Sequence, residues 1–481
     1  MLRDLSPRNT QEYLKRGIIA AVFVSPQEIT DNTVTLEVVE ARMGELRIEE
    51  HKYFKKNRLR DFWKIKAEEI LRYSRIKKFL DLMNRNPDRE VKATLHAGEK
   101  PGTTDILLRT KTRFPLHLIY SFDNEGSIST GKYRNSLGFR HNNLLGLDDV
   151  LMAGYMFGKD FSGKYAYHNL PIGASGTHLL YGYNESKAVP KKDFSQFGIN
   201  SQAENISFSL YQDIFNAKGE SLGELFLGFD AKDKTIKENA GTINRDRLRI
   251  INAGGNFVYR ALGSMTYFSP KFSQGVDTFG ASPNNNPLAS RAAKSSFSKF
   301  NFDVQRRQSL PCSFQANLKC KTQFASTKLM PQETFYLGGM NSVRGYPDGD
   351  YSADNAATAS GELLIPSFFI PQNIRLPYAK ESLRDQVTVF TFLDYGHGER
   401  RSPLSTEKKS VDFWGVGSGI RLRLYDQVLI RLEWGFPVGD KPITESCDSY
   451  FYISIDFEDK LPEELKRIGS LIKEKREGRS E

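Results

Sequence analysis

Residues 427–457 carry the sequence QVLIRLEWGFPVGDKPITESCDSYFYISIDF, which decides the fold. Apolar and polar side chains alternate through two parts of it, 427–436 and 449–457. In the first part the apolar face holds Val428, Ile430, Leu432, Trp434 and Phe436, opposite Gln427, Arg431 and Glu433. In the second part it holds Phe451, Ile453, Ile455 and Phe457, opposite Tyr450, Tyr452, Ser454 and Asp456. A period of two predicts β-strands with one apolar and one polar face.

The same alternation extends back along the chain to about Leu116. Segments of roughly ten residues recur between clusters of Gly, Asn, Asp and Ser, and they number about sixteen, an even count typical of transmembrane barrels. An arginine on a lipid-facing surface would cost about 2–4 kcal/mol, so we expect the apolar faces to point outward. No segment approaches the ~18–20 apolar residues that a membrane helix requires. We therefore predict a mainly β chain that forms a sixteen-stranded antiparallel transmembrane β-barrel. A soluble β-sandwich, whose strands would also alternate, is the alternative.

The composition argues against several other classes of protein. The formal net charge is +10, but the 68 basic residues are scattered rather than collected on one stripe. We therefore expect solvated loops and a mildly basic lumen, and no nucleic-acid partner. The three cysteines form no metal-ligand spacing, and neither a nucleotide-binding glycine motif nor a Ser/His/Asp order stands out. We expect no enzymatic activity, no cofactor and no metal site.

The residues before the barrel show a different, mixed pattern. The predicted strands lie at 33–39, from 46 onward, at 91–95 and at 106–108, and the predicted helices lie at 58–73 and 75–84. In the second helix Ile76, Phe79, Leu80 and Met83 recur at helical spacing and form an amphipathic stripe. From residue 46 the order is β-α-α-β-β, which a POTRA domain also shows. An independent small α+β adaptor is the alternative.

Three stretches resemble the two-partner secretion transporters, the haemolysin secretion/activation protein family. NRNPDREVKATL (84–95) and GEKPGTTDI (98–106) resemble the second POTRA domain of these proteins, and residues 120–149 resemble the start of their barrels. The resemblance implies the following domains: a partial first POTRA domain at 1–44, a second POTRA domain at 45–114 and the barrel at 115–457. It also implies a docking site, because the exposed edge of a POTRA sheet can bind an extended client by adding a strand.

A long segment between the eleventh and twelfth predicted strands carries the most specific motif. It has the sequence FYLGGMNSVRGYPDGDYSADNAATASGELLIP (335–366), in which LGG is followed by VRGY. This pair of motifs is typical of the superfamily that contains outer-membrane assembly proteins and these transporters. The motif residues are Gly338, Gly339, Val343, Arg344, Gly345 and Tyr346. The resemblance implies that the loop folds back into the lumen and that Arg344 pairs with an acidic residue of the barrel wall.

Candidate partners for Arg344 follow from a second motif and from the alternation of faces. FTFLDYGHG (390–398) matches the family's FxDxG wall motif and supplies Phe392, Asp394 and Gly396. Asp394 lies opposite the apolar face of its strand, and Glu362 shares a polar face with Thr358 and Ser360, so both carboxylates are expected in the lumen. Arginine suits such a site, because its rigid fork can hold a carboxylate through two hydrogen bonds. We also expect Tyr346 to pack against Phe390 or Phe392.

The two ends of the sequence depart from the family pattern. Met1 is followed by the charged LRDLSPRNTQEYLKR, so no signal peptide is visible, although export to an outer membrane requires one. Residues 458–481 extend beyond the point where the family's barrels normally end. Pro462 near the start of this charged tail and basic residues near its end predict a short helix.

Taken together, the patterns predict an outer-membrane transporter with its POTRA module in the periplasm. We expect it to act as a monomer in outer-membrane lipid, to capture an unfolded exoprotein of the haemolysin or adhesin type, and to secrete it through the barrel. An outer-membrane protein assembly factor of the same superfamily is one alternative. A passive pore or surface antigen is another.

Overall fold

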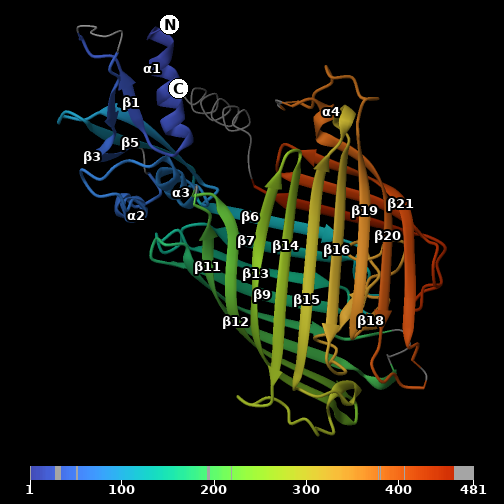
Figure 1. Cartoon of the computed structure of the whole chain (residues 1–481). Coiled ribbons are helices and arrows are strands. Elements are labelled where there is room, and N and C mark those ends of the chain that lie inside the picture. The colour runs from blue at the N-terminus through green and yellow to red at the C-terminus, as the bar shows by residue number, and fades with distance from the viewer. Residues whose placement is uncertain are drawn as a thin grey trace, which may run out of the picture.

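The computed structural model describes residues 2–27, 34–49, 52–191, 196–217, 219–377, 379, 381–405 and 407–459. It is mainly β, with a small α+β module beside one end of a large closed barrel (Figure 1). No helix in these parts of the chain is both long and apolar enough to span a membrane. The helix predicted for the C-terminal tail lies outside the described residues.

The barrel consists of sixteen antiparallel strands, as predicted. In chain order they are β6 (Leu116–Asp123), β7 (Arg134–His141), β8 (Val150–Gly158), β9 (Phe161–Ile172), β10 (Thr177–Ala188), β11 (Asn200–Phe215), β12 (Ser221–Glu238), β13 (Gly241–Ala261), β14 (Ser264–Val276), β15 (Phe297–Ser309), β16 (Gln315–Ala325), β19 (Asn355–Pro366), β20 (Val387–Glu399), β21 (Ser410–Leu424), β22 (Val428–Pro437) and β23 (Tyr450–Glu458). The last strand pairs with the first, with Phe457 opposite Tyr120, and so closes the barrel. Closure leaves no unpaired edge, which is the condition for strands to cross a membrane.

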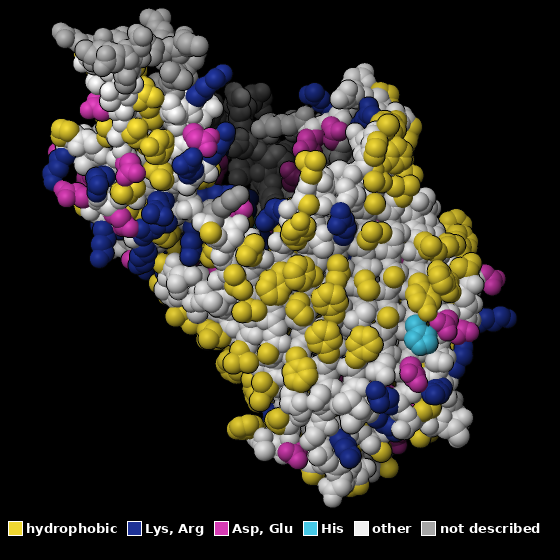
Figure 2. All heavy atoms as spheres, viewed as in Figure 1, with side chains coloured by type: hydrophobic (Ala, Val, Ile, Leu, Met, Phe, Trp, Pro, Cys, Tyr) yellow, Lys and Arg dark blue, Asp and Glu magenta, His cyan; other side chains and the backbone are white. Residues whose placement is uncertain are grey.

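The two faces of the strands differ as the alternation predicted. On β22, Trp434 is 52% exposed, whereas its neighbour Glu433 is buried inside the barrel. On β23, Phe451 is exposed and Tyr452 is fully buried. Figure 2 shows hydrophobic side chains spread over the outer surface of the visible strands, with charged side chains mainly toward the two ends of the barrel. Apolar side chains therefore cover the outside of the wall, and polar ones line the lumen.

The small module has the predicted β-α-α-β-β order. Its elements are β3 (Arg42–Glu49), α2 (Lys56–Phe62), α3 (Tyr73–Met83), β4 (Arg89–Ala97) and β5 (Thr103–Thr112). The strands form a three-stranded sheet in the order β3-β5-β4, in which β3 runs parallel and β4 antiparallel to β5. Side chains from both helices and the sheet form one core, including Leu59, Met83 and Ile106. This is the small α+β fold expected of a POTRA domain.

Two predicted elements of this region were too long. The helix expected at 58–73 ends at Phe62. The reason is that Leu71 is used as extended backbone: its N–H donates to Ala41 and its carbonyl accepts from Ile19. The strand expected at 33–39 is β2 (Glu37–Glu40), which pairs with β1 (Ala20–Phe23) in a separate two-stranded sheet after helix α1 (Leu2–Lys15).

The module is joined to the barrel through a buried carboxylate, Asp88, at the start of β4. It accepts hydrogen bonds from Arg113, from His117 on β6 (2.9 Å) and from Asn142 in the β7–β8 connection (2.7 Å). Beside it, Arg89 pairs with Asp148 of the same connection at 2.6 Å. Burial lowers the pKa of the Arg89 guanidinium, and Asp148 partly offsets this effect. These contacts hold the module against the end of the barrel where the β7–β8 connection lies.

We predict that Asp88→Ala loosens the module from the barrel. Its three donors would lose their shared acceptor, and we expect a cost on the order of 2–3 kcal/mol, because Arg113 remains partly hydrated. Glu90→Ala, two residues along the chain, is the matched control, since the Glu90 carboxylate pairs with Lys92 at the exposed surface. Hydrogen exchange of the 142–149 connection should accelerate in the Asp88 variant and stay unchanged in the control. Equal protection in the two variants would contradict this role for Asp88.

Candidate functional site in the barrel lumen

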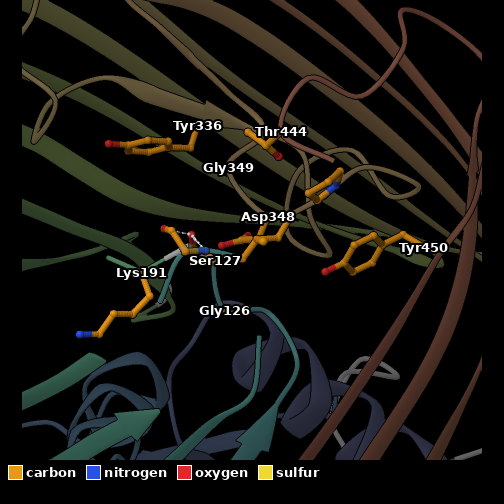
Figure 3. Close-up of a pocket in the computed structure, with 11 residues that line it drawn as sticks. Gly126, Ser127, Lys191, Tyr336, Asp348, Gly349, Thr444 and Tyr450 are labelled. Atoms are coloured by element: carbon orange, nitrogen blue, oxygen red, sulfur yellow. Dashed lines mark hydrogen bonds between the residues drawn. The ribbon is translucent and has the colours of Figure 1, made fainter. Parts of the chain in front are cut away.

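The connection between β16 and β19 folds back into the barrel. It contains a short hairpin formed by β17 (Phe335–Leu337) and β18 (Tyr351–Ala353), and residues 338–350 form its tip. Gly338 and Gly339 both adopt positive φ (98° and 95°), which glycine tolerates without the strain of a side chain. A cavity of about 680 Å³ lies beside the tip (Figure 3). It is lined from the loop by Tyr336, Asp348 and Gly349, and from the β6–β7 connection by Gly126 and Ser127.

Arg344 at the tip enters a cluster of acidic side chains on the wall. Its Nε and Nη2 donate to the two oxygens of Asp394 at 2.7 and 2.9 Å, and its backbone N–H donates to Oδ2 at 3.0 Å. Its Nη1 donates to Glu362 at 2.7 Å and to Glu433 at 2.8 Å. The guanidinium also lies 3.6 Å from the ring centre of Phe392, so it stacks on an aromatic face. Each of these side chains is at least 95% buried.

Sequence reasoning identified Asp394, Glu362 and Phe392 but missed two members of the cluster. Arg421 on β21 donates to both oxygens of Glu362 and to Glu433, so two arginines share three carboxylates. The alternation of β22 had already placed Glu433 on the polar face, but nothing in the sequence said how far along the barrel axis it lies. That height is determined by the register in which β21 and β22 pair.

Glycines of the wall let the loop backbone approach the strands. A Cβ at Gly396 would lie 2.6 Å from the Val343 side chain, and one at Gly435 would lie 2.6 Å from the backbone nitrogen of Gly345. A Cβ at Gly415 would clash with the carbonyl oxygen of Arg344. The wall motif's Gly396 is therefore a contact surface for the loop. Gly415 and Gly435 serve the same purpose although no predicted motif included them.

Tyr346 packs differently from the expectation. Its ring stacks on Phe413 of β21, rather than on Phe390 or Phe392, with 4.0 Å between ring centres, and its hydroxyl donates to the backbone carbonyl of Asp440. The reason lies in Gly345, whose φ of +99° turns the chain so that Arg344 and Tyr346 point in different directions. Arg344 instead occupies the face of Phe392. The hydroxyl of Tyr452 closes this turn by accepting from the Gly345 N–H and donating to the Tyr346 carbonyl.

A second charged cluster holds the part of the loop around Glu333, which we call the shoulder of the loop. Glu333 precedes the hairpin. Its carboxylate oxygens accept hydrogen bonds from the Nζ atoms of Lys232 on β12 and Lys299 on β15, each at 2.7 Å. Gln323 of β16 donates to the Glu333 carbonyl at 3.1 Å. The loop is therefore attached at its tip to β19–β22 and at its shoulder to β12–β16.

The comparisons with known proteins agree with this architecture. Residues 102–422, more than half of the chain, match the family model described as haemolysin secretion/activation protein ShlB/FhaC/HecB. The chain belongs to this family. Its members are outer-membrane transporters of two-partner secretion, which places the barrel in the outer membrane and the POTRA module in the periplasm.

Individual members of the haemolysin secretion/activation family are similar along most of the chain. A heme/hemopexin transporter protein, HuxB, from Haemophilus influenzae is 24% identical over 91% of this chain and 77% of its own length. An outer membrane transporter, CdiB, from Dickeya dadantii is 22% identical over 90% of this chain and 76% of its own length.

Among solved structures, CdiB from Escherichia coli aligns with a TM-score of 0.73 at 20% identity, covering 95% of this chain and 84% of that one. BamA from Haemophilus ducreyi, lacking POTRA domains 1–3, aligns with a TM-score of 0.61 at 14% identity, covering 95% and 93%. At these identities the structural likeness shows the shared fold.

We predict that Glu333→Gln releases the shoulder of the loop. The substitution keeps the shape of the side chain but leaves the buried Lys299 and the partly buried Lys232 without a carboxylate between them. The open-state conductance in planar bilayers should rise. Glu185→Gln is the matched control, because Glu185 also pairs with two lysines, Lys164 and Lys187, and both of these belong to the barrel wall. An unchanged conductance in the Glu333 variant, or an equal rise in both, would contradict a role in holding the loop.

One group of side chains in the described residues has metal-ligand chemistry. His178, Asp213 and Glu224 bring one ligand atom each within 4.8 Å of one another. The Asp213 carboxylate already forms an ion pair with the guanidinium of Arg85 in the module, at 2.5 Å. The group therefore forms a contact between the barrel and the module.

Proposed function

We propose that this chain captures an unfolded exoprotein of the haemolysin or adhesin type in the periplasm and secretes it through the barrel as a monomer. In this proposal residues 45–114 are the complete POTRA domain, 1–44 are part of another, and 115–457 are the barrel. One observation supports it above the others: a POTRA-like module is fastened at one end of a barrel whose lumen contains a docked loop. A passing chain must displace or pass that loop.

The Arg344 cluster would hold the loop in one defined position. Three carboxylates and two arginines leave a net charge of −1 in a buried site, so the arrangement depends on both arginines being present. A cluster of this kind is costly to desolvate and gives specificity of position more than stability. Its proposed role is to return the loop to the same place after each exported chain.

The edge strand β4 offers a docking site for an extended client. At Val91 the backbone N–H and carbonyl point away from β5, because both bond the side chain of Asn84. In an antiparallel pair every second residue points the same way, so the backbone groups of Ala93 and Leu95 face the outer edge as well. These groups have no hydrogen-bond partner among the described residues. The client would add a strand here through main-chain hydrogen bonds.

The proposal is tested with Leu95→Pro in cells that produce this chain together with an exoprotein that it secretes. Proline removes one outward N–H from the edge and leaves the β4–β5 hydrogen bonds in place. Secretion should fall several-fold, while Leu95→Ala, which keeps the N–H, should secrete normally.

Deletion of the whole chain separates the proposed function from its alternatives. Loss of the exoprotein from the medium, with normal levels of other outer-membrane proteins, is the expected result. A general loss of outer-membrane proteins would instead indicate an assembly factor. Normal secretion after deletion would indicate a passive pore.

A further inference from the structure

The connection between β19 and β20 differs from the others at its end of the barrel. It runs from Ser367 to Gln386 and includes the short helix α4 (Leu383–Gln386), whereas the β13–β14 connection at the same end comprises only Leu262 and Gly263. Periplasmic turns of outer-membrane barrels are normally short. A long connection there is expected to have a role of its own.

This connection exposes large apolar side chains. Phe369 is 69% exposed, Phe368 is 54% exposed and Ile374 is 44% exposed. The backbone near these side chains is held at two points: the Leu383 N–H donates to the Ile374 carbonyl, and Tyr425 of the next periplasmic connection donates to the Pro377 carbonyl. Exposed apolar groups on a fixed backbone mark an interaction surface.

The apolar side chains continue the lipid-facing surface of the barrel. The Phe368 ring packs against Phe314 in the β15–β16 connection, with 6.3 Å between ring centres. Directly beyond them, Leu318 on β16 and Leu363 on β19 are exposed on the outside of the wall. Figure 2 shows hydrophobic side chains gathered on the outer surface beside the place where Figure 1 labels α4.

We propose that residues 367–377 form a membrane-interface anchor that inserts Phe368, Phe369 and Ile374 into the periplasmic leaflet of the outer membrane. The occupant of the surface is phospholipid, for two reasons. The patch is continuous with the part of the barrel that already contacts acyl chains, and the Arg384 guanidinium lies 5.0 Å from the ring centre of Phe368. An aromatic side chain with a cation above it suits the boundary between headgroups and acyl chains.

The insertion is measured with single-cysteine proteins in vesicles of phosphatidylethanolamine and phosphatidylglycerol. Phe369→Cys, made with Cys312, Cys320 and Cys447 replaced by serine, carries an environment-sensitive fluorophore. Lipids with a nitroxide near the headgroup or near the chain end report depth, and iodide reports exposure to water. Ile374→Cys is a second probe of the same surface, should the first variant fold poorly.

The chain itself supplies both reference positions. The native Cys320, exposed on the outside of β16, reports the membrane core, and Tyr73→Cys on α3 reports the aqueous periplasmic side. We expect the labels at 369 and 374 to be quenched several-fold more by headgroup-level nitroxides than the label at 73, and to be largely shielded from iodide. Quenching by iodide equal to that at 73 would overturn the anchor. Shielding from both iodide and lipid nitroxides would also overturn it, because it would indicate a protein contact, such as a second copy.

Discussion

Arg344→Ala should undock the tip of the lumen loop and reduce secretion of the exoprotein about a hundredfold. The substitution leaves Glu362 and Glu433 buried with Arg421, and it removes the arginine from Asp394, which keeps the hydrogen bond from the Ser360 hydroxyl. Removing one partner from a buried ion pair costs about 3–5 kcal/mol. At the lower limit, which the polar lumen favours, the docking constant of the loop changes roughly a hundredfold. The export rate measures the loss of secretion, and the conductance in planar bilayers measures the undocking of the loop.

Two further variants isolate the geometry of this cluster. Arg431→Ala is the matched control, since Arg431 also faces the lumen but bonds Ser454 and pairs with Asp456, both on the wall. It should secrete at nearly the normal rate. Arg344→Lys keeps the charge but loses the fork that holds Asp394, so it should restore only part of the activity. Normal secretion by Arg344→Ala would show that the docked loop has no part in export.

Gly415→Ala should have the second-largest effect, although it changes a residue of the wall and leaves all charges in place. Its Cβ would clash with the Arg344 carbonyl oxygen, a backbone atom that cannot rotate away. The loop tip would have to withdraw, which would break the contacts of Arg344 and Tyr346 together. We expect conductance and secretion to change in the same direction as in Arg344→Ala, and by a similar factor.

The control for this experiment is Gly361→Ala on β19. That glycine also lies in the middle of a barrel strand with an ordinary φ, but its Cβ would meet only the Leu318 side chain, at 3.7 Å. It should fold and secrete like the unmodified chain. If Gly415→Ala behaves like Gly361→Ala, the loop does not rest on the wall during function. If both variants fail to insert into the membrane, the effect lies in strand formation.

The lumen cluster shows how far sequence reasoning reaches. The alternation of faces was enough to place Asp394 and Glu362 on the lumen side, because the direction of a side chain can be predicted from the neighbouring residues of its own strand. Arg421 escaped notice because its strand, β21, contains several glycines and its alternation is weak. The packing of Tyr346 was predicted wrongly because it depends on the φ of Gly345, which no pattern of residue types reveals.

The sequence by itself determines the barrel, its sixteen strands, the outward and inward faces and the order of the module's elements, and the resemblance carried by the LGG and VRGY motifs implies the place of the folded-back loop. These features follow from periods of two or 3.6 residues and from short motifs, all of which are local. Only the tertiary structure decides which side chains meet in the lumen. Closure of the barrel sets the register between β19, β20, β21 and β22, and that register brings Glu362, Asp394 and Glu433 within hydrogen-bond distance of Arg344. The physical reason is that the alternation within a strand specifies whether a side chain points into the lumen or outward. The position of that residue along the barrel axis is fixed only when every strand is paired.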